Sequence, residues 1–434
     1  MSRKYQPKTH RSRRKMQNLP ANAIKVDLAD GAATFQMVLP MSGLLAEVAG
    51  AIEQTASQAG LMMMKALIDE EVEHLTGSRY RHDPHRQAFR WGGEAGQLVF
   101  AGRKVALERP RVRGKDGREL PLRRYQAFQA PARMEAAVQT RMLRRVSTRD
   151  YAGALDDLCD GYGIEKSSVS RHWKAASAEQ LRQLLERRLE TLDLVALLLD
   201  GKEFQDTTLI TALGVDAEGR KHVLGLWPGA TENAQVCGAL LDELIERGLS
   251  PRQKYLFILD GSKALAKAVK ARFGGQALIQ RCRLHKERNL QSHLPPEYHK
   301  LLRLKLRAAW NLTDYVEAKR QLEKVHDWLA TINVAAAHSL EEGLEETLTV
   351  NRLGLPAELR RVFSTTNLIE SGFSLTADLC RNVKRWRDAN MVWRWAGTML
   401  AEAQRRFHRL HGYRLLAVLS TALKDSLAKG DAVA

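Results

Sequence analysis

Cysteine, long apolar runs and acidic residues are all scarce in this sequence. Its 434 residues include four cysteines, which are scattered along the chain as Cys159, Cys237, Cys282 and Cys380. A protein of this size can bury its cores without crosslinks, and the spacing forms no disulfide framework. The cysteines are therefore expected to be reduced thiols.

No apolar stretch of the sequence approaches the length of about 20 residues that a membrane-spanning helix needs. Residues 1–17 are rich in Arg and Lys, but no apolar segment follows at once, as it would in a signal peptide. We therefore expect a cytoplasmic protein with no membrane partner.

The shortage of acidic residues is the feature of the composition that best predicts a binding partner. Lys and Arg number 68 against 50 Asp and Glu, which gives a formal net charge of +18. Such a surplus favours a polyanionic partner, most often nucleic acid. A basic protein that is merely soluble is the alternative that charge alone leaves open.

Two of the acids end apolar runs that predict buried strands. Asp200 follows the run 195–199 and Asp260 follows the run 255–259, and a glycine comes next in each case. A carboxylate at the end of a buried strand is costly unless its charge is compensated, so the two acids are expected to converge on one sheet edge. A lone surface or capping carboxylate is the alternative at each position.

Glu370, far down the chain, supplies a third acid. Three carboxylates around one point suit a pair of hard divalent cations. In a strongly basic protein, this arrangement indicates phosphodiester chemistry.

The order of the predicted elements around these acids is that of an α/β protein. From residue 193 the pattern predicts three strands in a meander, a helix, the strand before Asp260, another helix and a further strand. A polar helical stretch, 286–362, precedes Glu370, and 368–423 is helical again. This is the RNase H-like order, interrupted by an all-helical insertion. The strand before Asp260 is the run 255–259, and the ranges of the other six elements are 195–201, 207–215, 221–226, 232–247, 262–273 and 277–282.

The N-terminal third is basic throughout. Residues 1–20 are predicted to be a disordered arm, either a solvated tail or a phosphate-binding segment. The apolar spacing of 42–76 predicts helices. Residues 79–125 carry many Arg and short β-type runs, which fit either a small β element that touches phosphates or a basic linker. Its candidate DNA contacts are Arg109, Arg111 and Arg113.

Residues 133–178 have the pattern of a helix-turn-helix. Tyr151, Leu155 and Leu158 share one helical face, the turn 161–163 follows, and a second helix comes next. An ordinary helical hairpin is the alternative. The basic, hydroxyl-rich second helix favours DNA, because such side chains bond phosphates and base edges. Its candidate DNA contacts are Lys166, Ser168, Ser170, Arg171 and Lys174.

Six short motifs occur in a specific order between about residues 130 and 423. They are 199–204 (Leu-Asp-Gly-Lys-Glu-Phe), 229–233 (Gly-Ala-Thr-Glu-Asn), 259–263 (Leu-Asp-Gly-Ser-Lys), 280–286 (Gln-Arg-Cys-Arg-Leu-His-Lys), 365–371 (Thr-Thr-Asn-Leu-Ile-Glu-Ser) and 384–387 (Lys-Arg-Trp-Arg). The ordered set resembles bacterial insertion-sequence transposases of the mutator type. At 371–373 this sequence has Ser-Gly-Phe where many relatives have Ser-Leu-Asn. This difference affects the expected local packing but not the assignment of Glu370.

The resemblance implies an RNase H-like nuclease whose catalytic triad is Asp200, Asp260 and Glu370. The expected ion is Mg²⁺, with Mn²⁺ as a substitute, in a two-metal site where Asp200 bridges the ions. His285 is a candidate catalytic residue that contacts the scissile phosphate or positions a strand, and Cys282 packs beside it. Core packing of both is the alternative. Cys282 and His285 are also half of a zinc site, but no partner pair lies nearby in the sequence.

Further cations follow these acids and are candidate DNA contacts. Lys263 and Lys286 come just after two strands of the catalytic edge, where they would neutralise phosphate charge. The segment 381–387 is predicted to be helical, and the nearby Trp386, Trp393 and Trp395 either stack on an unpaired base or, as we favour, pack in the core. The cations of this segment are Arg381, Lys384, Arg385 and Arg387.

The predicted function is that of a DNA transposase. Residues 1–178 would recognise the terminal inverted repeats of the element, and the triad would cut a strand so that the freed 3′-hydroxyl attacks a second phosphodiester. Joining two ends of double-stranded DNA requires at least a homodimer in the DNA complex. The protein is expected in a bacterial cytoplasm, associated with the nucleoid. The alternatives are another RNase H-like nuclease, such as a resolvase, and a domesticated, non-catalytic DNA-binding repressor.

These expectations divide the chain into seven segments. They are a basic arm (1–20), an N-terminal helical region (21–78), a small basic β-rich element (79–130), a helix-turn-helix-like DNA-binding domain (131–190), the first part of the catalytic domain (191–285), a helical insertion (286–362) and the second part of the catalytic domain with C-terminal helices (363–434).

Overall fold

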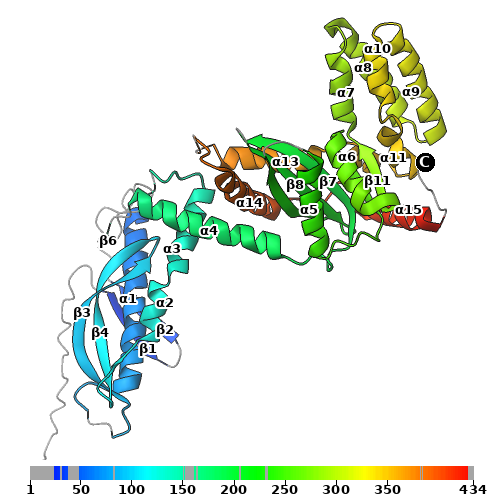
Figure 1. The fold of residues 1–434 in the computed structure, drawn as a ribbon. Helices are drawn as coiled ribbons and strands as arrows, with labels where there is room; N and C mark the ends of the chain where they lie inside the picture. Colours follow the sequence, from blue (N-terminus) through cyan, green and yellow to red (C-terminus); the bar gives the residue numbers. More distant parts are fainter. Residues whose placement is uncertain are drawn as a thin grey trace, which may run out of the picture. The chain divides into compact units, whose positions relative to one another are not determined.

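The structure, a computed structural model, describes residues 24–29, 32–37, 48–81, 84–149, 151, 161–162, 165–204, 207–229, 233–381, 383 and 385–428. The chain forms two compact units, residues 1–137 with 149–168 and residues 138–148 with 169–434 (Figure 1). The predicted arm, 1–20, lies outside the described residues, as do Leu155 and Leu158 of the predicted helix-turn-helix. No helix in the described ranges has the length and apolar character needed to cross a membrane.

The first unit is built around one long helix and a small antiparallel sheet. Its elements are β1 (Ile24–Ala29), β2 (Ala32–Met37), α1 (Val48–Thr76), β3 (Ala88–Phe100), β4 (Arg103–Gly114), β5 (Glu119–Leu120), α2 (Arg123–Gln129), the start of α3 (Pro131–Leu143) and β6 (Gly161–Tyr162). Helix α1 buries Ile68 and Val72 in one core with Val112 of β4 and Tyr125 of α2. The sheet therefore has one covered face, and its strand β3 also exposes the apolar side chains of Phe89 and Trp91.

Two predictions for this unit are wrong. The first two strands form an antiparallel pair inside 21–78, which the sequence analysis assigns to a helical region. Residues 24–29 alternate apolar and polar side chains with the period of a strand, and Asp30-Gly31 is a pair typical of hairpins. Gly161 and Tyr162, predicted as the turn of a helix-turn-helix, are instead a strand that pairs with β4. A distant sheet edge supplies their backbone partners, which no local pattern reveals.

The second unit contains a five-stranded mixed sheet in the order β11-β10-β7-β8-β9. The first three strands in sequence pair antiparallel, whereas β10 pairs parallel with both β7 and β11. The predicted strands of this region are confirmed, and the chain is an α/β protein. Glu232, the predicted start of the next helix, lies outside the described residues. The strands are β7 (Leu194–Phe204), β8 (Thr207–Asp216), β9 (Lys221–Gly229), β10 (Tyr255–Leu259) and β11 (Ala277–Arg281).

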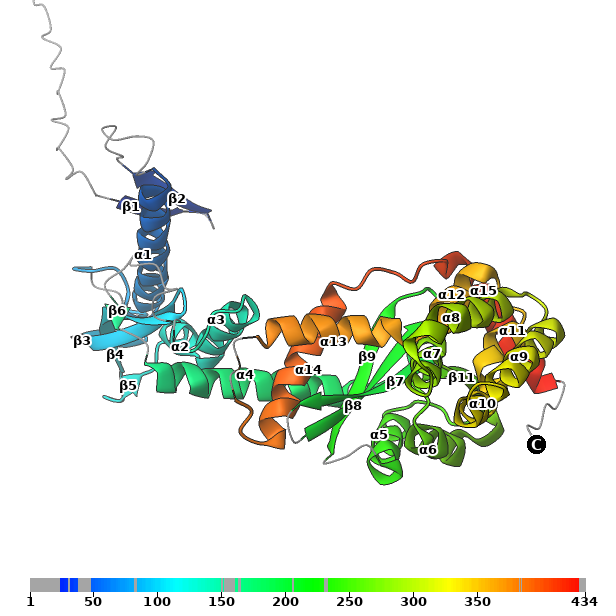
Figure 2. The same ribbon diagram turned by 90° about the horizontal axis from the view of Figure 1, so that it is seen from above.

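Helices cover both faces of this sheet. Along β7, Ala196 and Leu198 pack into one core and Leu197 and Leu199 into the other, because successive side chains point to opposite faces. Figure 2 shows α5 and α6 on one side of the sheet and α13 on the other. The covering helices are α4 (Lys166–Glu186), α5 (Ala234–Glu246), α6 (Lys263–Phe273), α13 (Asn367–Leu379), α14 (Ala389–Arg405) and α15 (Leu416–Ala428), with short 3₁₀ turns η2 (Gly274–Gln276) and η4 (Tyr413–Leu415).

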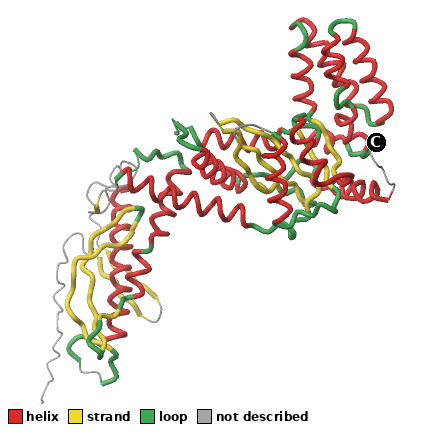
Figure 3. The backbone as a smooth tube through the Cα atoms, in the orientation of Figure 1, coloured by secondary structure: helices red, strands yellow, loops and turns green. Residues whose placement is uncertain are grey.

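An all-helical segment separates β11 from α13, as predicted, and Figure 3 shows it as a group of red helices beside the C-terminus. Leu302, Leu322 and Leu340 lie in a core of its own. The backbone N–H of Arg283 donates to the carbonyl of Ser364 at 2.9 Å, so the segment leaves and re-enters the sheet domain at one point. Its elements are α7 (Arg283–Ser292), α8 (Pro296–Asn311), α9 (Tyr315–Ala330), α10 (Val334–Glu341), η3 (Glu345–Leu348), α11 (Thr349–Arg352) and α12 (Ala357–Phe363).

Candidate active site

Asp200 lies where β7 loses its parallel neighbour. Strand β7 continues to Phe204, so the prediction that Asp200 ends its strand is wrong. The strand that ends is β10, at Leu259, which is in register with Leu199. Asp260 is the next residue after β10. Asp200 and Asp260 therefore directly follow the paired residues Leu199 and Leu259 on two neighbouring parallel strands. Asp200 is only 7% exposed.

The backbone after β10 turns around the carboxylate of Asp260. Its Oδ1 accepts a hydrogen bond from the backbone N–H of Ser262 at 2.9 Å, and the Ser262 hydroxyl caps α6 by accepting from the N–H of Leu265 at 3.3 Å. Gly261 between them has a φ of +111°, a conformation that favours glycine. The Asp-Gly-Ser sequence therefore builds the turn and starts the helix together.

Glu370 reaches the same edge from the first turn of α13. By the alternation along β7, Asp200 faces the side of the sheet that α13 covers. Ile369 and Phe373 pack into that core and fix the helix against the strands. The Nε2 atom of His285 lies 3.8 Å from Glu370 Oε1. The structure thus brings together all four residues predicted as catalytic.

The acids act on one another electrostatically. Burial, followed by the negative charge of Asp260 and more weakly that of Glu370, raises the pKa of Asp200 to about 7, against the opposing charge of His285. The positive charge of His285 therefore offsets the effects of burial and of the other two acids only in part. A cluster of titratable groups with shifted pKa values is typical of a functional site.

Cys282, His285 and Thr366 form a cluster beside these acids. Thr366 donates its backbone N–H to Sγ of the buried Cys282 at 3.4 Å, and its Oγ1 lies 3.4 Å from His285 Nδ1. The hydrogen bond with Cys282, aided by the charges of Cys282, Asp200 and Asp260, raises the pKa of His285 to about 8 despite burial. Burial raises the pKa of Cys282, but the hydrogen bonds from His285 and Thr366 outweigh it and lower that pKa overall. The surroundings of His285 thus favour its protonated form.

Thr366 is a candidate functional residue that sequence reasoning missed. Its hydroxyl also lies 3.1 Å from Glu370 Oε1 and 3.5 Å from Cys282 Sγ, and with one proton to donate it favours the closer carboxylate. The residue is fully buried at the start of α13. A threonine four residues before an acid at a helix start is a weak signal, because many helices begin with threonine.

Metal binding at this edge would require side-chain movement. Within the described ranges, no three His, Cys, Asp or Glu side chains are already arranged to hold a metal ion. This applies to the zinc alternative for Cys282 and His285 and also to the predicted triad. The donor set of the triad is nevertheless all oxygen, which suits Mg²⁺, and Glu370 is one-third exposed and has room to change rotamer.

A model of the transposases of the Mutator family matches residues 45–409, a span that includes all three acids. The chain belongs to the Mutator family of transposases. The resemblance drawn from the six sequence motifs is thereby confirmed.

Individual relatives agree with this family. The chain is 28% identical over 322 residues to the transposase for insertion sequence element ISRM5 of Rhizobium meliloti, which covers 71% of this chain and 77% of that protein. It is 26% identical over 322 residues to the transposase for IS256 in transposon Tn4001 of Staphylococcus aureus, covering 70% and 77%. The transposase for IS6120 of Mycolicibacterium smegmatis is 28% identical over 239 residues, covering 54% and 72%.

In this Mutator-family chain the predicted second helix of the helix-turn-helix is confirmed as the start of α4. Val169 and Trp173 are buried, as its apolar stripe predicts. Ser168 is half-buried. The remaining candidate DNA contacts of this helix are exposed, namely Lys166, Ser170, Arg171 and Lys174.

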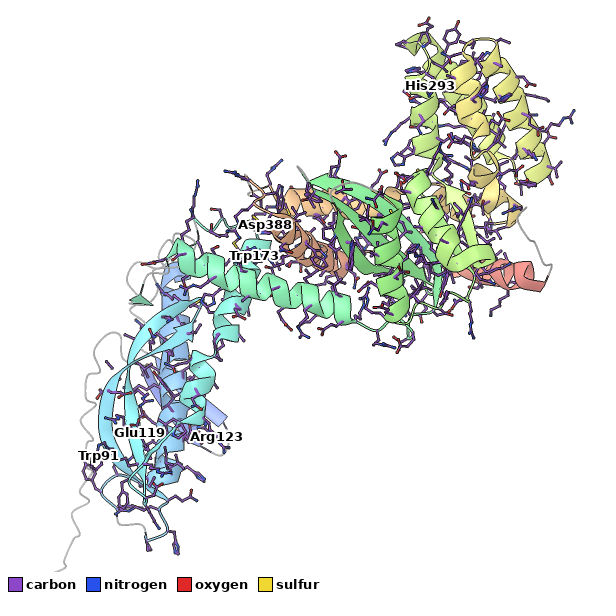
Figure 4. All side chains as sticks on the ribbon, in the orientation of Figure 1. Trp91, Glu119, Arg123, Trp173, His293 and Asp388 are labelled. Atoms are coloured by element: carbon purple, nitrogen blue, oxygen red, sulfur yellow. The ribbon has the colours of Figure 1, made fainter. Side chains whose placement is uncertain are left out.

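The candidate contacts on β4 have partners that the sequence analysis did not foresee. Arg109 lies 2.7 Å from Glu94 and Arg111 lies 2.6 Å from Glu119, so acids from β3 and β5 offset part of their charge. The guanidinium of Arg113 lies 4.0 Å from the ring centroid of Trp91. Figure 4 labels Trp91 and Glu119 on this sheet.

The two lysines near the acids differ in their exposure. Lys263 is 85% exposed and lies 3.1 Å from Glu342. Lys286 is 1% exposed, and its ammonium donates to the carbonyls of Ser339 and Glu342. The predicted DNA contact of Lys286 is therefore wrong, because its charge is held inside the helical segment.

The described residues of the segment 381–387, which are 381, 383 and 385–387, do not form the predicted helix. Helix α13 ends at Leu379 and α14 begins at Ala389, after Asp388 (labelled in Figure 4) accepts a capping hydrogen bond from the N–H of Met391. Asp388, as a helix-capping residue, was the overlooked sequence signal that a new helix begins at Ala389. Trp386 packs on Phe204 and Trp395, which supports the core role favoured for the tryptophans. Arg381, Arg385 and Arg387 are exposed, and Lys384 lies outside the described residues.

Proposed function

We propose that this Mutator-family transposase binds the terminal inverted repeats of its insertion element and catalyses Mg²⁺-dependent DNA strand cleavage and strand transfer. The observation that carries the proposal is the convergence of Asp200, Asp260 and Glu370 at one edge of the mixed sheet, where the last two raise the pKa of the first. The named relatives are transposases for insertion sequence elements. A net charge of +18 suits a DNA partner.

We assign the sheet domain to the RNase H-like class. Counted from β7, the strand order is 3-2-1-4-5. The first three strands are antiparallel and the last two run parallel to the first, with a helical segment inserted before α13. This order supports the assignment, and it agrees with the position of one acid on the first strand and one after the fourth.

The carboxylates of Asp200, Asp260 and Glu370 would together hold the divalent ions. Mn²⁺ has the same preference for oxygen and is the expected substitute. Bound there, the ions would supply activation of the attacking water or 3′-hydroxyl and stabilisation of the leaving oxygen.

His285 contributes a positive charge beside this site. Its raised pKa, about 8, favours the protonated imidazole, which can donate a hydrogen bond to an oxygen of the scissile phosphate. Thr366 orients Glu370 and contacts the same imidazole. Cys282 is buried behind them and holds Thr366 in place.

DNA recognition is assigned to the basic N-terminal unit and to the exposed start of α4. The element ends would be read there, while the exposed cations Arg381, Arg385 and Arg387 hold the strand near the acids. Since strand transfer joins two ends, the active form in the DNA complex is at least a homodimer.

A cleavage and joining assay on DNA from the element ends, with Mg²⁺, tests the proposal. Asp200→Asn, Asp260→Asn and Glu370→Gln are each expected to reduce cutting by about a thousandfold or more, while end binding stays within about threefold of wild type. Asp327→Asn, whose side chain is 81% exposed on the helical segment, is the matched control and should cut normally.

The outcomes separate the competing functions. End-specific binding without any cutting by the wild type would favour the repressor, and cutting without joining would favour a simple nuclease. Normal cutting by Glu370→Gln would mean that the third ligand lies elsewhere.

A further inference from the structure

A basic pocket lies next to Asp260, beyond the turn that its carboxylate organises. It has a volume of about 420 Å³ and opens between α6 and the loop that follows α10. Gly261 and Ser262, the two residues after Asp260, belong to its wall. The cations that line it are Lys263, Lys267, Lys270 and Arg281, against the two acids Glu342 and Glu346.

Arg281 is the innermost cation of the pocket. It is 7% exposed, and its Nη1 and Nη2 donate to the carbonyls of Glu342 at 2.9 Å and Gly261 at 3.3 Å. Its Nε is buried and has no hydrogen-bond partner in the described part of the chain. A Cβ on Gly261 would come within 2.6 Å of this Nε, so the guanidinium fills the space that the missing side chain leaves. No carboxylate of the described residues forms an ion pair with Arg281. The hydrogen bond from Lys263, together with the charge of Arg281, lowers the pKa of Glu342 in the same pocket, so the charge of the buried guanidinium is only partly compensated.

Three lysines on one face of α6 form the outer wall. Lys263, Lys267 and Lys270 follow the spacing of four and three residues that places side chains in a row. Lys263 pairs with Glu342 and Lys270 with Glu346, each at 3.1 Å. Lys267 is exposed between them and has no acidic partner among the described residues. Exposed ion pairs of this kind are weak, so a ligand with a stronger negative charge can replace them.

We propose that this pocket binds a phosphodiester group of the DNA strand held in the active site, close to the scissile one. The proposal rests on the proposed function. The Asp260–Ser262 turn forms both the ligand-bearing edge of the sheet and the wall of the pocket, so a strand that reaches Asp260 passes its entrance. The start of α6 adds the partial positive charge of a helix N-terminus on the same side.

This arrangement gives the pocket a positioning role in the reaction. One phosphate anchored by Arg281 and Lys267 fixes the strand relative to Asp260, which orients the neighbouring phosphate for in-line attack. Binding there exchanges the Lys263–Glu342 ion pair for a contact with the DNA backbone. The occupant is the DNA backbone and not a free anion, because the pocket is open beside the proposed strand path.

The test compares the full-length wild type with Lys267→Gln and with Lys300→Gln, an exposed lysine of α8 outside the pocket. The probes are pre-cut element-end duplexes in EDTA, each with one neutral methylphosphonate at a different position around the cleavage site. Fluorescence anisotropy at fixed salt measures the affinity. At one position the neutral linkage is expected to weaken wild-type binding about three- to tenfold, and Lys267→Gln should weaken binding of the unmodified probe by the same factor.

The decisive result is the combination of the two changes. In Lys267→Gln, the methylphosphonate at that position should cause no further loss of DNA affinity. In Lys300→Gln, the same methylphosphonate should weaken binding as much as it does in the wild type. Additive losses at every position would overturn the pocket while leaving end-specific binding, and hence the proposed function, intact. Failure of the wild type to prefer element ends over unrelated DNA would instead reject the proposed function. If inorganic phosphate removes the sensitivity of the wild type without displacing the probe, the site binds a free anion and the assignment to the backbone is wrong.

Discussion

Thr366 Oγ1 lies 3.1 Å from Glu370 Oε1, one helical turn away. Thr366 is fully buried, and its backbone N–H is tied to Cys282 Sγ, so the hydroxyl is held in a fixed position. The third acid of the site, alone among the three in being on a helix, is therefore oriented from the core rather than from solvent.

Thr366→Val keeps the shape of the side chain and removes the hydroxyl. We expect strand cleavage to slow by about tenfold, the lower end of the effect of losing a partner that orients a metal ligand. The concentration of Mg²⁺ needed for half-maximal activity should rise, and DNA binding should be unchanged. Ser371→Ala, which removes an exposed hydroxyl bonded to the carbonyl of Asn367 on the same helix, is the control. Equal effects of the two substitutions would contradict an orienting role.

Gly343→Ala should disrupt the position of Arg281. Gly343 has a φ of +75°, and a Cβ there would collide with Arg281 Nη1. Gly354→Ala is a matched control, because Gly354 has a φ of +62° and nothing lies within 4 Å of the added atom.

Both substitutions should lose about 1–2 kcal/mol of stability to backbone strain, and Gly343→Ala a further 1–3 kcal/mol to the collision. Differential scanning calorimetry measures the difference in melting temperature. Matching melting temperatures would show that Arg281 moves aside at no cost.

Asp216, at the end of β8, should make the second unit sensitive to acid. It is 3% exposed, and it accepts hydrogen bonds from the backbone N–H groups of Glu218 and Arg220 and from the side chain of Arg220, with His222 Nε2 at 2.9 Å. Burial raises the pKa of Asp216, but the hydrogen bonds of His222 and Arg220 outweigh it and lower the pKa overall.

Because the folded pKa is below the unfolded value of about 3.9, the stabilisation is complete above that pH and is lost as pH falls through the folded pKa. Asp216→Asn should therefore cost about 1–3 kcal/mol at pH 7. The gap in melting temperature from wild type should narrow below about pH 4. A gap that stays constant from pH 7 to pH 3 would show that charge at this position is irrelevant.

The sheet and its acids could be predicted from the sequence because their signals are local. The all-apolar runs before Asp200 and Asp260 are typical of strands covered on both faces, and they are short for a helix and followed by Asp-Gly. The position of Glu370 came from the resemblance alone, since a glutamate in the first turn of a helix is common. The end of β7 was predicted too early, because β7 continues past Asp200 while its neighbour β10 ends at Leu259.

What the sequence could not provide were the partners of its cations. Lys286 and Arg281 stand in one basic motif, 280–286, and look alike in sequence, yet the first is held by carbonyls of the helical segment and the second faces a pocket. Likewise, acids far along the chain or on a neighbouring strand pair with Lys263 and Arg109. Such pairings depend on long-range folding, which spacing does not encode.

The hydrogen bond between Arg283 and Ser364 also bears on how the chain can change in length. Since the two ends of the helical segment are tied together, everything between them is a closed loop whose ends the sheet domain already holds. The entropy of closing such a loop grows only with the logarithm of its length, so adding or removing helices there costs the sheet domain little. The carboxylates can therefore stay in place while those parts of the segment that do not contact the sheet domain or line the pocket are free to diverge.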